Sequence, residues 1–310
     1  MHRGQSVTTA VAEVVVESNA PIPTWFGIGG RADRLARPSS IEQLRQCIQT
    51  DPGLRILGDG ANLLVDDGGV GELVVVLDHP CFSRVERNSG TGMTSVGAGA
   101  NLPKLITASV RQRLGGIEGL GGIPATLGGA VVMNAGGAFG QIADAVVRVR
   151  ALDRSGRDVV LDRDEIDFSY RHSGLSGLII CSVDLDLHEE DPEALRDRLK
   201  EVMDYKKRSQ PMADRSAGCV FKNPTLPEDL ADIGSAGERV SAGMLIDRAG
   251  CKGLKVGSAS VSPRHANFIV AEPATSRAGE VIALMDAVRA RVRDAFGVEL
   301  EPEVVIWKRN

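Results

Sequence analysis

The chain has 310 residues, which is enough for two or three domains that each bury a hydrophobic core. Its hydrophobic content of 43% and charged content of 25% are typical of a soluble globular protein. The formal net charge of −5 argues against a general binder of nucleic acid or anionic membranes, and no segment approaches the ~20 apolar residues of a transmembrane helix.

The N-terminus and the cysteines indicate the compartment. Residues 1–19 form a poor secretion signal, because glutamates interrupt their apolar part. The 5 cysteines include no CxxC pair and are odd in number, while the 5 histidines lack the spacing of a metal motif. We therefore expect a cytoplasmic monomer with neither a disulfide framework nor a bound metal.

Residues up to about 190 are expected to form an α+β unit with several strands and few long helices. Ser39 and Glu42 have the spacing of a capping box, which predicts a helix over 39–51. The other predicted elements are strands at 54–57 and 71–78 around a loop at 58–70, a strand at 94–100, a helix at 102–116 that Gly115 ends, a hairpin at 146–162 that turns at 154–157, and a strand at 177–187.

A break is expected at 188–195, where "HEEDPEAL" is acidic and contains proline. The segments beyond it indicate a separate α/β domain. They are helices at 193–211, 241–250 and 276–297, a strand at 265–271 and a terminal strand at 301–308.

Two glycine-rich loops are the first functional signal. "LGDGANLLV" places Gly58 and Gly60 directly after a strand, and a second run of glycines lies between Gly115 and Gly140. One such loop alone is more often a tight turn, but glycines also let backbone N–H groups converge on phosphate oxygens. Neither loop fits the Rossmann or P-loop pattern, so a diphosphate-bearing cofactor on another fold is the sharper interpretation.

Cys219 lies in an unusual place. Its segment "SAGCVFKNP" is polar and turn-prone, whereas Cys181 in "LIICSVDLDL" lies among aliphatic residues as a structural cysteine does. Packing alone does not explain the thiol at 219.

Together these segments resemble the UDP-N-acetylenolpyruvoylglucosamine reductases (MurB), the flavoenzymes of peptidoglycan synthesis. The resemblance runs from about Pro23 to Trp307, and the absence of a long insertion after the YR motif is similar to the shorter class of the family. Its segments are "TWFGIGGRADRLARP", "LGDGANLLV", "GIPATLGGAVVMNAGGAFG", "FSYRHSG", "SAGCVFKNP", "HANFIV" and "LEPEV".

The resemblance implies an FAD-binding fold of the vanillyl-alcohol-oxidase (PCMH) type. It implies an N-terminal extension at 1–22, an FAD domain at 23–190 with subdomains of about 23–80 and 81–190, and a substrate domain at 195–310. Ala61 and Ala125 depart from the usual serine and glycine of the family. The implied cofactor-binding residues are Gly58, Gly60, Ala61, Asn62, Gly122, Ile123, Pro124, Thr126, Gly128, Gly129 and Ala130.

The resemblance also implies the chemistry. FAD, reduced by NADPH, would reduce UDP-N-acetylglucosamine enolpyruvate to UDP-N-acetylmuramate for the cell wall. Arg171 and Glu303 would stabilise the charge that develops on the substrate, and Cys219 would replace the family's serine as proton donor. A thiol is intrinsically a better acid than an alcohol, but a thiolate could not donate. The implied substrate-binding residues are Tyr170, Asn223, Lys207 and Arg208, with Lys206 also a candidate for the diphosphate.

Simpler interpretations remain for several of these residues. Arg171 could form a surface ion pair, Glu303 could be a solvated carboxylate, and Cys219 could be a filler while Ser216 or water donates the proton. His265 is expected to order a loop. Two other functions compete with the reductase: another FAD-dependent oxidoreductase on the same fold, and a catalytically silent paralogue that binds FAD or a UDP-sugar.

Overall fold

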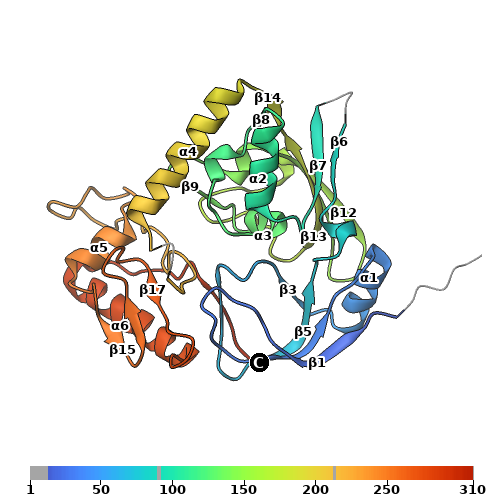
Figure 1. The fold of residues 1–310 in the computed structure, drawn as a ribbon. Helices are drawn as coiled ribbons and strands as arrows, with labels where there is room; N and C mark the ends of the chain where they lie inside the picture. Colours follow the sequence, from blue (N-terminus) through green and yellow to red (C-terminus); the bar gives the residue numbers. More distant parts are fainter. Residues whose placement is uncertain (1–12, 89–91, 212–213, 310) are drawn as a thin grey trace, which may run out of the picture.

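The computed structural model describes residues 13–88, 92–211 and 214–309, and it confirms the predicted α+β class (Figure 1). The N-terminal sheet has the strand order β1-β2-β5-β3, with β1 antiparallel to β2 and the other pairs parallel. Helix α1 (Ile41–Thr50) packs its buried side chains into the same core. The strands are β1 (Val16–Ala20), β2 (Ala32–Ala36), β5 (Val70–Val76) and β3 (Arg55–Leu57).

The second sheet is antiparallel throughout and has the order β12-β11-β13-β7-β6. Helix α3 (Leu127–Val132) packs against β13 and β7, and α2 (Leu102–Arg111) shares their hydrophobic core. The strands are β12 (Asp158–Asp162), β11 (Val146–Leu152), β13 (Ile179–Asp186), β7 (Met93–Gly97) and β6 (Val85–Arg87).

Short elements complete this part of the chain. The pair β8 and β14 connects the end of α2 to the start of helix α4 (Pro192–Ser209), and β9 pairs with β10 beside α3. The strands are β8 (Leu114–Gly115), β14 (His188–Glu189), β9 (Gly136–Gly137) and β10 (Gly140–Gln141). The single-turn helices are η1 (Pro80–Phe82), η2 (Glu118–Leu120), η3 (Ile142–Asp144) and η4 (Arg163–Glu165).

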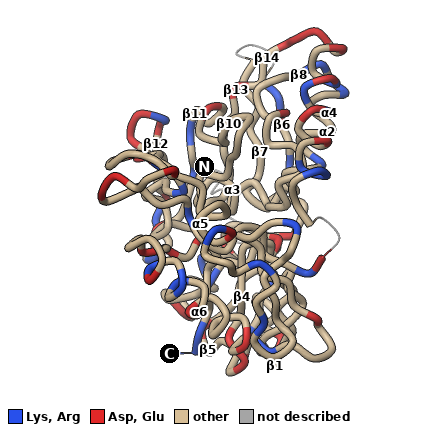
Figure 2. The backbone as a smooth tube through the Cα atoms, turned by 90° about the vertical axis from the view of Figure 1, so that its left-hand side faces the viewer, with Lys and Arg blue, Asp and Glu red and all other residues tan. Residues whose placement is uncertain are grey.

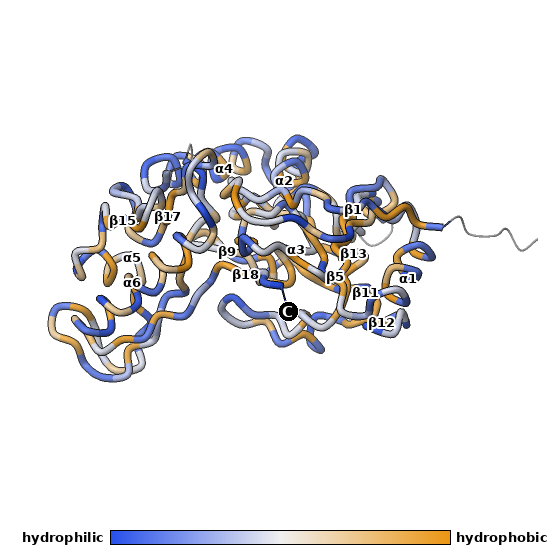
Figure 3. The backbone as a smooth tube through the Cα atoms, turned by 90° about the horizontal axis from the view of Figure 1, so that it is seen from below, coloured by the Kyte–Doolittle hydropathy of each residue, from blue (hydrophilic) through white to orange (hydrophobic). Residues whose placement is uncertain are grey.

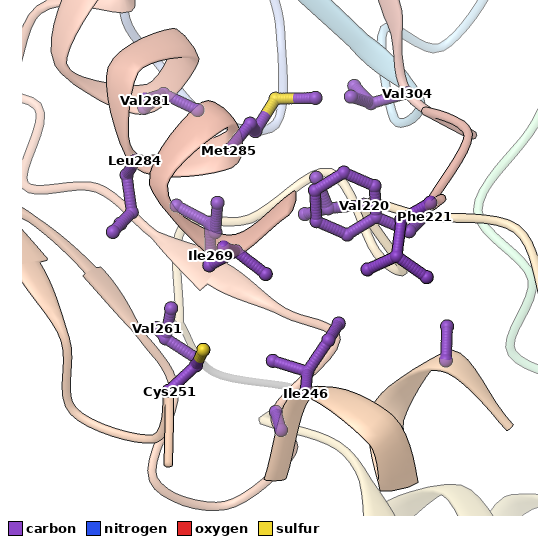
Figure 4. Close-up of a cluster of buried hydrophobic side chains, with 14 of the residues drawn as sticks. Val220, Phe221, Ile246, Cys251, Val261, Ile269, Val281, Leu284, Met285 and Val304 are labelled. Atoms are coloured by element: carbon purple, nitrogen blue, oxygen red, sulfur yellow. The ribbon is translucent and has the colours of Figure 1, made fainter. Parts of the chain in front are cut away.

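The C-terminal third builds a separate core around helix α6 (Ala278–Phe296) (Figure 4). Helix α5 (Ala242–Arg248) and a small antiparallel sheet of β15 (Lys255–Val256), β16 (Ala259–Val261) and β17 (Ile269–Val270) surround it. Val220, Phe221 and Val304 point into this core in Figure 4. They are sequence neighbours of Cys219 and Glu303, so the core fixes the backbone that carries both side chains.

The last strand, β18 (Val305–Trp307), does not lie in the C-terminal sheet. It pairs in parallel with β4 (Leu63–Val65), directly after the first glycine loop. Leu64 from β4 in turn packs into the C-terminal core. The predicted terminal strand is therefore present, but it pairs with a strand of the N-terminal part of the chain instead of completing a C-terminal domain.

The structure corrects several local predictions. Ser40, not Ser39, caps α1, because its side chain accepts the hydrogen bond from the Gln43 backbone N–H. Helix α2 ends at Arg111, and Gly115 lies in β8 instead of ending the helix. The predicted strand at 265–271 is shorter than expected: residues 266–267 form a turn, Phe268 forms an isolated bridge with Cys219, and β17 spans only Ile269–Val270.

Ten strands of the described residues were not predicted: β1, β2, β4, β6 and β16 have three or more residues, and β8, β9, β10, β14 and β15 have two each. They are short, or carry charged residues among the apolar ones, so their alternation is weak. Because β1 pairs with β2, the predicted extension at 1–22 contains part of the N-terminal sheet. Residues 1–12 of that extension lie outside the described part of the chain.

Charge and hydropathy follow this arrangement. On the face shown in Figure 2, acidic and basic segments are interspersed, in keeping with the small net charge. In Figure 3 the hydrophobic segments gather along strands such as β5 and β13 in the interior of the molecule. No helix among the described residues is both long and apolar enough to cross a bilayer.

Candidate active site

A cleft of about 1280 Å³ is lined by residues from the N-terminal sheet, the second sheet and its loops, and the C-terminal third. Both glycine loops line it, together with side chains from the C-terminal third. All eleven predicted cofactor-binding residues, including Ala61, are among the lining residues, and so is Ala125, the other departure from the family pattern. The two loops that were singled out in sequence therefore meet at one place.

The first loop requires its glycines for steric reasons. Gly60 has φ +66°, and a Cβ built there would lie 2.2 Å from the Pro23 carbonyl oxygen. A Cβ on Gly58 would lie 2.8 Å from Oγ1 of Thr126, which belongs to the second loop. The two loops thus touch at Gly58, where a side chain would push them apart, whereas a side chain at Gly60 would clash with the backbone of Pro23.

The second loop leads into α3. Thr126 caps this helix, with Oγ1 accepting a hydrogen bond of 3.3 Å from the Gly129 N–H. A Cβ on Gly128 would lie 2.9 Å from the Cβ of Ala98, which forces close packing of the loop on the second sheet. The loop therefore presents backbone to the cleft with little side-chain cover.

These surroundings fit FAD. Two loops offer backbone N–H groups with almost no side chains, as a diphosphate requires. Apolar residues also line the cleft, and flat ring systems could pack against them. They include Leu54, Ile56, Leu57, Leu178, Ile180 and Trp307.

Arg171 lies at the tip of a tight turn. Ser169 and His172 exchange backbone hydrogen bonds across it, and Arg171 takes φ +55°, a left-handed conformation that is uncommon for a residue with a side chain. Its Nε donates to Oε1 of Glu303 over 2.6 Å, and Nη1 donates to the Gly136 carbonyl over 3.0 Å. This turn directs the guanidinium into the cleft.

Glu303 comes from the C-terminal end of the chain, just before β18. Its backbone N–H donates to the Val220 carbonyl over 2.8 Å, which places it beside the Cys219 segment. Burial raises the pKa of the Glu303 carboxyl, and the neighbouring Arg171 opposes this shift. The carboxyl is neither solvated nor unpaired, so the simpler interpretation of Glu303 as a surface group is wrong.

Cys219 lines the same cleft. It forms an isolated bridge with Phe268, and the next residue, Val220, donates its N–H to the Asn267 carbonyl. Burial raises the pKa of the Cys219 thiol to about 12, and the negative charge of Glu303 adds to the shift. The thiol is therefore protonated throughout the physiological range, despite Lys222 nearby in sequence.

Tyr170 and Asn223 are in contact with each other. The Asn223 backbone N–H donates to the Tyr170 hydroxyl over 3.1 Å, and the Asn223 side-chain carbonyl accepts from the backbone N–H of Ala242, the first residue of α5, over 3.0 Å. Asn223 lines the cleft, whereas Tyr170 is not among the described residues that line it. Tyr170 thus supports the site from behind. The Arg239 guanidinium stacks 4.3 Å from its ring centroid, a contact that the sequence did not suggest.

Among the three basic residues at the end of α4, Lys206 lines the cleft. Lys207 and Arg208 are exposed and are not among the described lining residues, so the expectation that they hold the substrate is not supported by the geometry. Burial, together with the charge of Arg171, lowers the pKa of Lys206 to about 8. The spacing of Leu195, Leu199, Val202 and Lys206 on one helix face could have identified this residue in sequence.

Two buried asparagines were also missed. Asn134, 1% exposed, donates from Nδ2 to the Ser169 carbonyl of the Arg171 turn over 2.8 Å and to Gln141 over 3.0 Å. Asn267, 2% exposed, exchanges hydrogen bonds with both backbone groups of Phe221, two residues after Cys219. Their signal in sequence was a polar residue within an apolar segment, "VVMNAGG" and "HANFIV".

His265 orders the loop around Asn267, as expected. Its Nδ1 accepts the Asn267 N–H over 3.2 Å, and its ring packs edge-on against Phe268. Burial lowers the pKa of His265, so the ring is neutral and suited to accepting this bond. Within the described residues, no group of three or more His, Cys, Asp or Glu side chains is arranged to hold a metal ion.

Comparisons with known proteins agree with this geometry. Residues 210–307 match the family model for the UDP-N-acetylenolpyruvoylglucosamine reductase C-terminal domain, and residues 32–162 match that of an FAD binding domain. The chain is 40% identical over 300 residues to the UDP-N-acetylenolpyruvoylglucosamine reductase of Moorella thermoacetica, covering 94% of this chain and 93% of that protein.

Two further relatives are similar over nearly their whole length. The reductase of the same name from Desulfosudis oleivorans is 39% identical over 298 residues, covering 91% of each chain. The crystal structure of UDP-N-acetylenolpyruvylglucosamine reductase from Thermus caldophilus superimposes with a TM-score of 0.79 at 39% identity, covering 95% of this chain and 99% of that one.

Proposed function

The chain belongs to the UDP-N-acetylenolpyruvoylglucosamine reductase family of FAD-dependent oxidoreductases, and on this premise we propose that it reduces UDP-N-acetylglucosamine enolpyruvate to UDP-N-acetylmuramate with NADPH, for peptidoglycan synthesis in the cytoplasm. When bound, FAD would take a hydride from NADPH and deliver it to the enolpyruvyl double bond. The two glycine loops, Gly58–Asn62 and Gly122–Ala130, would hold its diphosphate. We assign the flavin chiefly to residues 23–190 and the substrate to 195–310.

Arg171 is proposed to stabilise charge. Hydride addition to the terminal alkene carbon leaves an electron pair that is delocalised into the substrate carboxylate. A guanidinium is suited to a charge spread over two oxygens, because its N–H groups form a planar fork. The bonds to Glu303 and Gly136 hold Nε and Nη1, which leaves Nη2 to face a ligand. Such preorganised donors act strongly in a site that excludes water.

Glu303 is proposed to hold Arg171 and to share a proton with the charged intermediate. The raised pKa of the Glu303 carboxyl supports this role, since a protonated or hydrogen-bonded acid does not repel a dianion. The 2.6 Å bond to Arg171 fixes the orientation of both groups before the substrate arrives.

Cys219 is proposed as the proton donor. In this step the S–H bond breaks, a C–H bond forms at the carbon next to the carboxylate, and the electron pair of the intermediate enters that new bond. The thiolate then regains a proton from solvent. The raised pKa of the Cys219 thiol ensures that the donating form is present at the start. The overall reaction consumes NADPH and one proton.

Lys206 is proposed to contact the substrate diphosphate. It lies in the cleft between Arg171 and Gly122, where the methylene stem of Lys206 is 3.2 Å from a Cβ built at Gly122. A dianionic ligand there would favour the charged ammonium. Asn223, also in the cleft, is a second substrate contact, supported from behind by Tyr170.

The observation that carries the proposal is the convergence of Arg171, Cys219 and Glu303, from three distant segments, on the cleft that both glycine loops line. An anaerobic titration tests it. NADPH should bleach the visible absorbance of the flavin, and UDP-N-acetylglucosamine enolpyruvate should restore it. Bleaching without recovery would favour another flavoenzyme activity. A colourless protein that takes up no added FAD would refute the flavin site.

A further inference from the structure

Asn62 ends the first glycine loop, and its contacts lead away from the loop. Its Nδ2 donates to the Glu303 carbonyl oxygen over 3.0 Å, although the two residues are 241 positions apart in sequence. The Asn62 backbone carbonyl accepts the Val305 N–H, also over 3.0 Å. The two bonds enclose a single residue, Val304. One asparagine thus holds the chain on both sides of the peptide that follows Glu303.

The side-chain bond is not needed for strand pairing. The parallel ladder of β4 and β18 begins with Leu63 opposite Val305 and is made by backbone groups alone. The side-chain amide of Asn62, the residue before Leu63, adds a restraint outside this ladder by binding the backbone carbonyl of Glu303. The other side of that residue is held by the Val220 carbonyl, which accepts the Glu303 N–H.

From this geometry we propose that Asn62 is a positioning residue, which sets the place of the Glu303 carboxylate relative to the flavin loop. The inference rests on the proposed function, and it replaces the expected role of the Asn62 side chain as a cofactor ligand. Nδ2 must face Glu303, because the partner is a carbonyl and only the amide N–H can donate to it. Contacts of the loop with a diphosphate would come from backbone N–H groups.

The test separates the two half-reactions of the enzyme. Flavin reduction by NADPH requires no group from the Arg171–Glu303 pair, whereas reoxidation by the enolpyruvyl substrate requires both. For Asn62→Ala and Asn62→Asp, we expect reoxidation to slow by about 10- to 50-fold, since misplacement of a catalytic group by ~1 Å can cause losses of 10². Flavin reduction and the Kd for FAD, measured from flavin fluorescence, should change by less than about threefold.

A double-mutant cycle measures the coupling between Asn62 and Glu303 in the reoxidation rate. A general loss of stability in the Asn62 variant would not produce such coupling. If Asn62 acts through Glu303, Asn62→Ala should have little further effect on reoxidation in a Glu303→Ala background. The control is Val65→Ala, which removes buried methyl groups from β4 but no hydrogen bond. It should lower the melting temperature and leave both half-reactions at the parent rates.

The outcomes are distinct. Weaker FAD binding in Asn62→Ala, with normal reoxidation once FAD is added back, would make Asn62 a cofactor ligand and overturn the inference. Equal slowing of both half-reactions, or full additivity with Glu303→Ala, would overturn it as well. Failure of the parent protein to reoxidise with the enolpyruvyl sugar would instead refute the proposed function, and the inference with it.

Discussion

Replacement of Cys219 by alanine removes the only S–H group that lines the cleft among the described residues. A well-placed general acid contributes about 10²- to 10⁴-fold to a rate, so the oxidative half-reaction of Cys219→Ala should slow by at least 10². That factor corresponds to about 2.7 kcal/mol of transition-state stabilisation. Cys219→Ser restores an O–H donor at the same position and should remain active.

The pH dependence provides an independent check. Because burial and Glu303 raise the pKa of Cys219 to about 12, only about one thiol in 10⁴ is ionised at pH 8. A raised pKa means that the donating form persists as pH rises and is lost only near pH 12. The parent enzyme should therefore show no loss of reoxidation rate from Cys219 below about pH 11, and alkylating reagents should modify this thiol slowly.

The assay is anaerobic stopped-flow mixing of the NADPH-reduced protein with the enolpyruvyl substrate, followed by flavin absorbance. Solvent deuterium should slow the parent and the serine variant, in both of which an exchangeable proton is donated. Reoxidation of Cys219→Ala at the parent rate would refute the proton-donor role. Rapid alkylation of Cys219 at pH 8 would refute the argument from its environment.

Three other predictions test the surroundings of the thiol. Glu303→Gln keeps an acceptor for Arg171 but no exchangeable acid, so reoxidation should fall about 10-fold while flavin reduction stays normal; equal rates would contradict a role for the acid. Because the pKa of Lys206 is lowered to about 8, the KM for the UDP substrate should rise above that pH. Lys206→Met should remove this rise, and the exposed Lys207→Met is the control that should retain it. Gly60→Ala places a methyl group 2.2 Å from a backbone oxygen at φ +66°, and should cost at least about 2 kcal/mol of unfolding free energy in urea titrations, with loss of bound FAD; a normal titration would contradict the loop geometry.

The parts of the site that sequence predicted are those with an intrinsic local signal. Gly58 and Gly60 are informative because a Cβ on Gly58 would clash with the Thr126 side chain and one on Gly60 with the Pro23 backbone. Cys219 stood out because its neighbours were unsuited to burying a thiol. Arg171 and Glu303 had no local signal of their own and were assigned through the resemblance. The structure gives the physical reason for both: each is the other's partner.

The parts that sequence did not predict depend on long-range contacts. The pairing of β4 with β18 joins two three-residue strands, each too short to show a period of two. The proposed role of Asn62 depends on the pairing of β4 with β18, so sequence analysis alone could not predict this role. Lys206, Lys207 and Arg208 are consecutive on a helix and point about 100° apart, which means that only the phase of the helix decides which one faces the cleft.

The separation of 241 residues between Asn62 and Glu303 also has a consequence for the order of folding. Closing a loop of this length carries an entropic term of about 5 kcal/mol, and long-range contacts of this kind form late. On a ribosome that adds roughly 5 to 20 residues per second, the first glycine loop waits about 10 to 50 s for its partner strand. A nascent chain can therefore display its flavin loop well before the carboxylate is in place. Refolding of the full chain should show the same order of events, with flavin uptake ahead of the return of substrate reduction.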